Sequence, residues 1–267
     1  SRLNRALHLG MLLSFFTLAI TGMMLKFSYM GWAQGLAWLL GGFETTGTLH
    51  RLGAVVLFVV FFLHLREVLR RKRRENLGWK QILTGSDTIL FTLDDLRQVV
   101  QSMKWFFGLG PRPHYGRYTY WEKFDYFAVF WGVLVIGSTG FVLWFPEIFT
   151  YLLPGWSVNV ATIIHSDEAL LAVGFIFTSH DFTTHVRPDK VPLDPGIFTG
   201  RMTLDELKFD KPAEYERLVA SGELEQNLVK PMAPKLERAF RIFGFVALAV
   251  GLTLIALILY AMLFGYR

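Results

Sequence analysis

The sequence predicts an all-α membrane protein in which four transmembrane helices form a bundle and a fifth is an extra C-terminal helix. The chain has 267 residues, 52% of them hydrophobic, and a mean hydropathy of +0.37. A run of about 20 apolar residues is long enough to cross the hydrocarbon core of a bilayer as a helix. Five such runs occur, at about 6–27, 47–69, 122–145, 158–184 and 239–264.

Two long polar stretches, about 70–121 and 185–238, divide the chain. We expect the four-helix bundle to occupy 1–186, with 70–121 as a cytoplasmic loop within it. A cytoplasmic lobe at 187–238 and a C-terminal helix at 239–267 follow. Several prolines and then mixed acidic and basic helix formers predict one or two short helices in the lobe.

The first run is predicted to be a retained helix rather than a signal peptide. It lacks a small-residue cleavage site, and a second span follows after a short connection. Because the first residue is Ser rather than Met, we expect the N-terminus of the full protein to be missing or processed.

The remaining runs differ in what they carry. The third contains Gly132, Gly137 and Gly140, where a neighbouring helix or a flat macrocycle can approach closely. The text "IGSTGFVLW" in the third run loosely repeats "LAITGMML" in the first. The fifth run is predicted to be a packing or partner-docking helix.

The positive charges predict the orientation of the chain. Six cations crowd the end of the second run (Arg66, Arg70, Arg71, Lys72, Arg73 and Arg74), whereas the short connections 28–46 and 146–157 contain no Lys or Arg. The positive-inside rule then places the N-terminus and both long loops in the cytoplasm and the C-terminus outside, in a bacterial-type inner membrane. Since this charge adjoins membrane spans, it does not indicate a nucleic-acid partner.

Four histidines form two long pairs on two of the runs. His50 and His64 are 14 residues apart, and His165 and His180 are 15 apart. At about 100° and 1.5 Å per residue, each pair shares one helix face and is separated by roughly 21–23 Å along the helix. Two facing helices of this kind predict bis-histidine haem b, one near each membrane surface, because imidazole suits low-spin haem iron.

The outer haem is predicted to be held by His50 and His165. On the inner side His180 is the expected ligand from the fourth run, and its partner is either His64 or His8. If His64 is the partner, His8 and His185 remain and could hold a third haem. The chain contains no Cys, which excludes covalent haem, iron–sulfur clusters and thiolate-held zinc. Arginines near these ligands are candidates for binding the haem propionates: Arg5, Arg51, Arg66 and Arg187.

The text around these histidines resembles the cytochrome b subunit of formate dehydrogenases, and related b subunits of nickel–iron hydrogenases and thiosulfate reductase-type enzymes. The similar segments are "NRALHLGMLLSFFTLAITGM", "LHRLGAVVLFVVFFLHL" and "YWEKFDYFAVFWGVLVIGSTGFVLWFPEIFTYLLP" followed by "TIIHSDEALL". The resemblance covers about 1–186. It implies a haem bundle that passes electrons between a partner enzyme and the quinone pool, with His50 and His165 as one ligand pair and His8 and His180 as the other.

The chain departs from that family in three ways. It has His64 where the dehydrogenase subunit is apolar, it has one extra residue between His165 and His180 together with His185, and it adds a lobe and a fifth helix. The lobe text "RPDKVPLD" is similar to b cytochromes associated with multihaem cytochromes c. The expected partner is therefore a multihaem cytochrome c or an iron–sulfur or catalytic subunit of the same complex.

The resemblance also implies a quinone or menaquinone site beside the inner haem, in the loop that enters the third run. The matching text is "HYGRYTYWEK", although the family has an asparagine where Thr119 stands. Donors to quinone carbonyls and a proton carrier could come from side chains of this segment, and the candidates are His114, Arg117, Tyr118, Thr119 and Glu122.

Three functions compete on this evidence. The first is a quinone-linked electron-transfer subunit, and the second is a haem wire without its own quinone site. The third is a proton-coupled transporter whose histidines form a relay, although transporters usually have more spans and inverted repeats. No nucleophile–base set, phosphate loop or open metal site indicates an autonomous enzyme.

Overall fold

Long helices dominate the computed structural model, which describes residues 2–85, 88–183, 190–191 and 193–265. No β-strand occurs within these ranges. Five helical segments are long and apolar enough to span a membrane: α1 (Arg2–Lys26), α3 (Phe43–Arg74), α6 (Tyr120–Trp144), α8 (Trp156–Phe175) continued by η1 (Ile176–His180), and α13 (Pro234–Phe264). The prediction of an all-α membrane protein with five transmembrane helices is confirmed.

Shorter helices lie between these spans: α2 (Gly31–Leu39), α4 (Trp79–Thr84), α5 (Leu93–Phe106), α7 (Pro146–Thr150), α9 (Gly196–Thr199), α10 (Leu204–Asp210), α11 (Pro212–Ala220) and α12 (Glu223–Asn227). The chain divides into two compact units. The membrane unit comprises Ser1–Arg66, Phe130–Phe198 and Arg238–Arg267, and the polar unit comprises Glu67–Val129 and Thr199–Glu237. Each unit is described by itself below.

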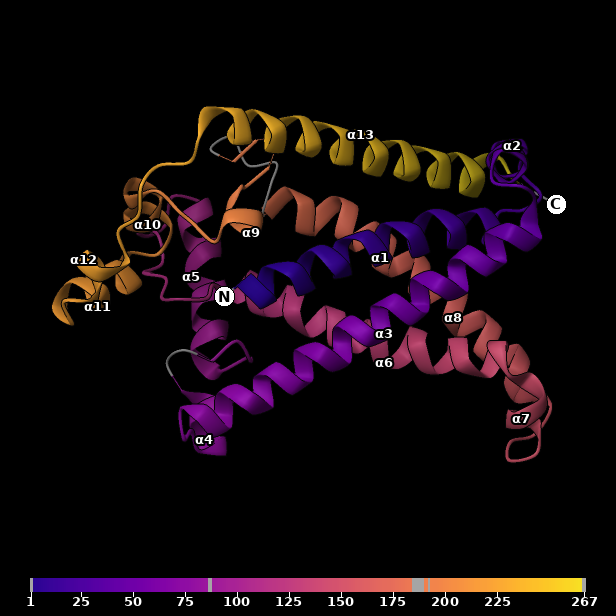
Figure 1. Ribbon diagram of the computed structural model, residues 1–267, viewed down its shortest axis with the longest axis horizontal. Helices are drawn as coiled ribbons and strands as arrows, with labels where there is room; N and C mark the ends of the chain where they lie inside the picture. Colours follow the sequence, from indigo (N-terminus) through magenta and orange to yellow (C-terminus); the bar gives the residue numbers. More distant parts are fainter. Residues whose placement is uncertain (1, 86–87, 184–189, 192, 266–267) are drawn as a thin grey trace. The chain divides into compact units, whose positions relative to one another are not determined.

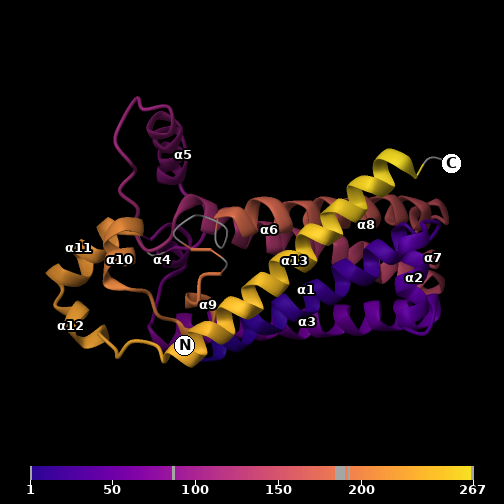
Figure 2. The same ribbon diagram turned by 90° about the horizontal axis from the view of Figure 1, so that it is seen from above.

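In the membrane unit, α1, α3, α6 and α8 are all elongated along the horizontal axis of the views, and α3 and α8 cross in the view of Figure 1 (Figures 1 and 2). The main buried cluster joins three helices, with Met23 from α1, Phe177 from η1, and Leu254 and Ile258 from α13 among its members. The fifth transmembrane helix therefore packs against the first and fourth. Burial of such side chains stabilises by about 1.5–3 kcal/mol each in water, but in lipid the close packing itself holds helices together.

A charged contact also ties α1 to α8. The Lys26 ammonium lies 2.8 Å from a carboxylate oxygen of Asp167 and donates to the Ser166 hydroxyl at 3.0 Å. These residues stand at the C-terminal end of α1 and in the middle of α8. The pair therefore sets the register of the two helices at one end of the unit.

The fourth span is not a uniform α-helix, as the apolar run had suggested. After Phe175 the backbone widens into the π-turn η1, and the Asp181 amide donates to the Ile176 carbonyl five residues earlier. A π-turn accommodates one extra residue without ending the helix. With that residue absorbed, His165 and His180 are related by the equivalent of 14 α-helical steps, which matches the spacing of His50 and His64.

The polar unit combines segments from both polar stretches of the sequence. Arg112 pairs with Asp210 at 3.2 Å, and the Ala213 amide donates to the Tyr115 carbonyl at 3.1 Å. The described residues of the lobe contain four short helices (α9, α10, α11 and α12), where one or two had been expected. The second polar stretch thus folds onto the loop between α3 and α6.

We expect Gly251→Ala to destabilise the membrane unit, because a Cβ at this position would lie 2.5 Å from Cδ1 of Phe177. Overpacking of a well-packed core typically costs about 1–3 kcal/mol. The matched control is Gly174→Ala, where a Cβ meets nothing within 4 Å. Thermal unfolding of both variants in lipid nanodiscs measures the difference, and equal midpoints would show that α13 does not pack on η1 this closely.

Candidate functional site

His50 of α3 and His165 of α8 face each other in the membrane unit. Their ring centroids are 6.2 Å apart and their planes make an angle of 76°. With a metal–nitrogen bond of about 2.0 Å and roughly 1.1 Å from nitrogen to centroid, two imidazoles on one metal ion have centroids about 6 Å apart. The separation of the two rings is therefore the one expected if both imidazoles held a single haem iron.

The hydrogen bond at His50 leaves its Nε2 nitrogen free to bind a metal. Nδ1 lies 3.0 Å from the hydroxyl of Thr21 on α1, and that hydroxyl donates its own proton to the Thr17 carbonyl at 2.6 Å. The Thr21 oxygen must then accept the Nδ1 proton, since a hydroxyl has only one to donate. In the neutral imidazole the lone pair consequently resides on Nε2, the arrangement that metal-bound histidines usually have.

The hydrogen bonds at His165 lead to the same tautomer by a different route. Its Nδ1 lies 2.9 Å from the carbonyl oxygen of Ile136 on α6, which can only accept a proton. The Thr139 hydroxyl is 3.4 Å away and donates to the Val135 carbonyl at 2.7 Å. Both rings thus direct an N–H at a neighbouring helix and retain an unshared pair on the opposite nitrogen.

Each of the two rings rests against a glycine that adjoins these threonines. A Cβ on Gly22 would lie 3.1 Å from Cε1 of His50, and a Cβ on Gly140 would lie 3.0 Å from Cε1 of His165. A larger residue at either position would force the imidazole to move. The repeated Thr-Gly text of the first and third spans, noted above as a loose similarity, therefore marks the two helices that support the paired histidines.

His8 belongs to α1, whose Phe15 and Phe16 pack on Phe177 of η1, the turn that ends with His180. His64 packs edge-on against Phe130 of α6, with centroids 6.2 Å apart. His185 lies outside the described residues, so the structure does not test the pairing of His8 with His185. In the described ranges no three His, Cys, Asp or Glu side chains gather as a metal site, whereas a porphyrin needs only two from the protein.

The candidate propionate ligands have varied surroundings. Arg5 donates to the Phe198 carbonyl at 2.9 Å, and Arg51 lies over the Trp144 ring at 5.7 Å from its centroid. Arg66 is exposed on α3. Arg187 is among the residues that the structure does not describe. Of these arginines, Arg51 adjoins His50 in sequence and belongs to the same helix.

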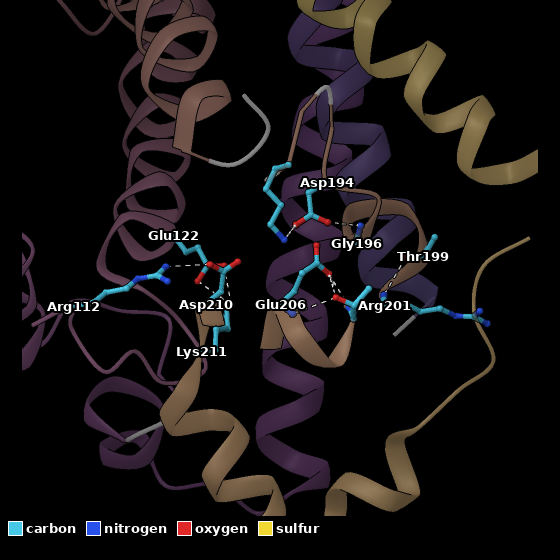
Figure 3. Close-up of polar contacts among 11 residues, drawn as sticks. Arg112, Glu122, Asp194, Gly196, Thr199, Arg201, Glu206, Asp210 and Lys211 are labelled. Atoms are coloured by element: carbon cyan, nitrogen blue, oxygen red, sulfur yellow. Dashed lines mark hydrogen bonds and ion pairs between the residues drawn. The ribbon is translucent and has the colours of Figure 1, made fainter. Parts of the chain in front are cut away.

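The five candidate quinone ligands lie in the polar unit, where Glu122 has structural partners. The Thr119 amide and hydroxyl donate to the Glu122 carboxylate at 2.8 and 3.0 Å, which forms a capping box at the start of α6. Lys211 donates to the same carboxylate at 2.9 Å. Figure 3 shows Glu122 and Asp210 next to each other, with Arg112 and Lys211 directed toward them.

The other candidates of this loop also contact the lobe or each other. His114 lies 3.4 Å from a carboxylate oxygen of Glu216, with both side chains exposed. Arg117 and Lys211 approach the Tyr118 ring at 5.8 and 5.9 Å from its centroid. The structure thus brings all five residues into one unit and gives Thr119 and Glu122 a role in holding α6.

Residues 1–85 match the family model described as prokaryotic cytochrome b561. The matched segment contains α1 and α3 and so carries His8, His50 and His64. A comparison with curated proteins gives no match to the chain. Over the matched residues, the predicted resemblance to membrane cytochromes b is confirmed.

We expect Thr21→Val to weaken the hold of His50 on a bound haem, because it removes the acceptor of the Nδ1 proton. Loss of such a partner typically costs about 10–100-fold in metal affinity. Thr139→Val should have a smaller effect, since the Ile136 carbonyl still accepts from His165. The rate of haem transfer to an excess of apo-globin, followed optically, measures both.

Thr48→Val is the matched control, because the Thr48 hydroxyl bonds only its own helix at Glu44. An equal loss of haem from the Thr21→Val and Thr139→Val proteins would contradict the assigned difference between the two histidines.

Proposed function

We propose that the chain is a membrane b-type cytochrome that carries electrons across the bilayer between the quinone pool and a partner redox protein, as the electron-transfer subunit of a larger oxidoreductase complex. The observation that carries this proposal is the His50–His165 pair, whose centroids are 6.2 Å apart and whose Nδ1 atoms are both hydrogen-bonded to neighbouring helices. The match of residues 1–85 to prokaryotic cytochrome b561 supports it.

A haem b held by two imidazoles supplies one-electron transfer and has no open iron position for oxygen chemistry. The chain's part is to hold the two imidazoles from opposite sides with fixed tautomers. Thr21 and the Ile136 carbonyl orient the rings, and Gly22 and Gly140 leave room for them. The two acceptors of the Nδ1 protons, Thr21 and the Ile136 carbonyl, also raise the basicity of the ligating nitrogens, which favours the oxidised metal.

For the inner position we assign His8 and His180 as the ligand pair. The packing of Phe15 and Phe16 of α1 on Phe177 of η1 supports this assignment, and so does the resemblance to the formate dehydrogenase subunit. His64 then packs on Phe130 beside the site, and the chain holds two haems. The alternative pairs His64 with His180 and His8 with His185, and holds three.

The positions of the two pairs along the membrane helices link the function to the membrane potential. His165 and His180 are 15 residues apart on the fourth span, roughly 22 Å along the helix. Moving one elementary charge across the full membrane field is worth about 2.3 kcal/mol per 100 mV. If protons are exchanged at the inner surface while electrons move to or from the outer one, turnover is electrogenic.

The loop before α6 is the proposed quinone site, with Glu122 as the proton carrier and Tyr118 and His114 as donors. The exposed His114 and the aromatic Tyr118 favour this role, because a quinone needs a hydrogen-bond donor and a flat apolar neighbour.

The proposed partner protein is a multihaem cytochrome c or an iron–sulfur or catalytic subunit of the same complex. The basic end of α3 and the N-terminus then lie in the cytoplasm.

A haem wire without its own quinone site is the second candidate function. The contacts of Glu122 favour it, since its carboxylate accepts from Thr119 and from Lys211 and already serves in helix capping and charge pairing. In that case the partner proteins alone exchange electrons with other carriers.

We expect the purified full chain to contain two haems, measured as pyridine haemochrome per mole of protein. His64→Leu should retain both, whereas His8→Leu and His180→Leu should each lose one. A ratio of three in the unaltered protein, or loss of haem from the His64→Leu protein, would favour the alternative pairing. A ratio near zero would contradict the proposed function as a whole.

We expect Glu122→Gln to slow quinone-coupled haem reduction while both haem spectra persist, because glutamine can cap α6 but cannot carry a proton. Lys211→Gln is the matched control, since it breaks the same ion pair and leaves the carboxylate in place. Stopped-flow reduction by a quinol measures both variants. Equal rates in the two proteins would indicate a structural role for the pair and favour the haem wire.

A further inference from the structure

Helix α5 has its polar side turned toward the rest of the polar unit. Asp95 is fully buried and lies 2.9 Å from the Lys123 ammonium at the start of α6. On the same side, the Ser102 hydroxyl lies 2.6 Å from the hydroxyl of Tyr115. Asp95 also accepts from the Thr92 amide at 2.6 Å, which caps the helix. Polar contacts therefore fix the rotation of α5 about its axis.

A second face of α5, next to these polar contacts, is apolar and exposed. At about 100° per residue, every apolar side chain of the helix except Trp105 falls within an arc of roughly 140°. Five large members of this arc are 53–78% exposed: Leu93, Leu96, Val100, Met103 and Phe106. A water-facing helix of a folded unit normally shows the reverse pattern. A continuous apolar face of this kind indicates contact with something apolar.

The residues just before α5 contact the first turns of α6, which is a membrane-spanning helix. The Phe91 ring lies 6.3 and 6.4 Å from the rings of Phe124 and Phe127 on α6. Phe124 and Phe127 are themselves exposed on a helix that crosses the membrane. The apolar surface of α6 that faces lipid is thus continuous with Phe91 at the entry to α5.

The connection of the chain keeps α5 near one membrane surface. The segment 75–119 joins the end of α3 to the start of α6 and contains no apolar run long enough to cross a bilayer. Both ends of the segment must then lie on the same side. With 14 residues, α5 is about 21 Å long, which is too short to span the hydrocarbon core.

The charges beside the apolar arc complement a lipid surface. Lys104 and Arg97 stand at about 20° and 40° beyond Leu93, next to one edge of the arc, and the Arg97 guanidinium lies 3.0 Å from the exposed Asp94 carboxylate. Long cationic side chains in that position can keep their stems along apolar groups and direct their charges at phosphate headgroups. On the other edge, the Asp95 carboxylate is buried and paired with Lys123, so it does not repel anionic lipid.

We propose that α5 lies in the plane of the membrane as an interfacial helix, with its apolar arc in the acyl boundary of the lipid and Arg97 and Lys104 at the headgroups. The bilayer surface itself is then the partner of this face. The interaction holds the polar unit against the membrane at the start of α6. It is independent of whether the chain binds haem.

The absence of cysteine from the chain permits a direct test. A nitroxide label is attached to a single introduced cysteine in the full chain, reconstituted into vesicles that contain anionic phospholipid. Leu96→Cys, Val100→Cys and Met103→Cys probe the apolar arc, and Gln101→Cys probes the opposite side of the same helix. Leu134→Cys, which is exposed midway along α6, serves as the lipid reference, and Glu225→Cys on α12 as the aqueous reference.

We expect the ratio of collisions with oxygen to collisions with a water-soluble nickel chelate to be about tenfold higher at 96, 100 and 103 than at 101, because an interfacial helix buries its apolar face about 5–10 Å deep. A ratio at the three arc positions equal to that at Glu225→Cys would overturn the proposal, since the face would be in water. Low accessibility to both reagents would overturn it too, because a second copy or another protein would then cover the face.

Discussion

The proton on Nδ1 of each paired histidine is the constraint on which the candidate site depends. A buried N–H without an acceptor costs about 1–3 kcal/mol, so every such proton needs a partner on a neighbouring helix. Thr21 supplies the acceptor for His50, and the Ile136 carbonyl supplies it for His165. Because these acceptors fix the tautomer, the same contacts that join the helices also leave an unshared pair on Nε2 of each ring.

The two halves of this site are built alike from different helices. In each half a histidine from one span rests against the Thr-Gly pair of another, α3 against α1 and α8 against α6. The difference lies in the primary acceptor, which is a hydroxyl in one half and a backbone carbonyl in the other. A side-chain acceptor can be lost by substitution and a carbonyl cannot, so the two histidines differ in their sensitivity to change.

Much of the fold could be predicted from the sequence because membrane spans require long apolar runs, and these are visible without a structure. The sequence also predicted that His50 and His165 would lie close together, because they stand at corresponding ends of two spans. The π-turn did not, since nothing in the residues Ile176–His180 distinguishes a widened turn from an α-helical one. The partners of Glu122 were equally hidden, because Lys211 lies 89 residues away in a polar segment without hydrophobic periodicity.

The widened turn at Ile176–His180 has a consequence for how ligand spacing should be compared between proteins. A membrane helix can gain one residue and still present the same side chains to its neighbours, provided that the insertion is taken up in a single loosened turn. Gly251 of α13 leaves room for the Phe177 ring of that turn, so the fifth helix packs directly against the widened turn. Alignments that penalise a one-residue gap inside a span would therefore misplace the second histidine of such a chain.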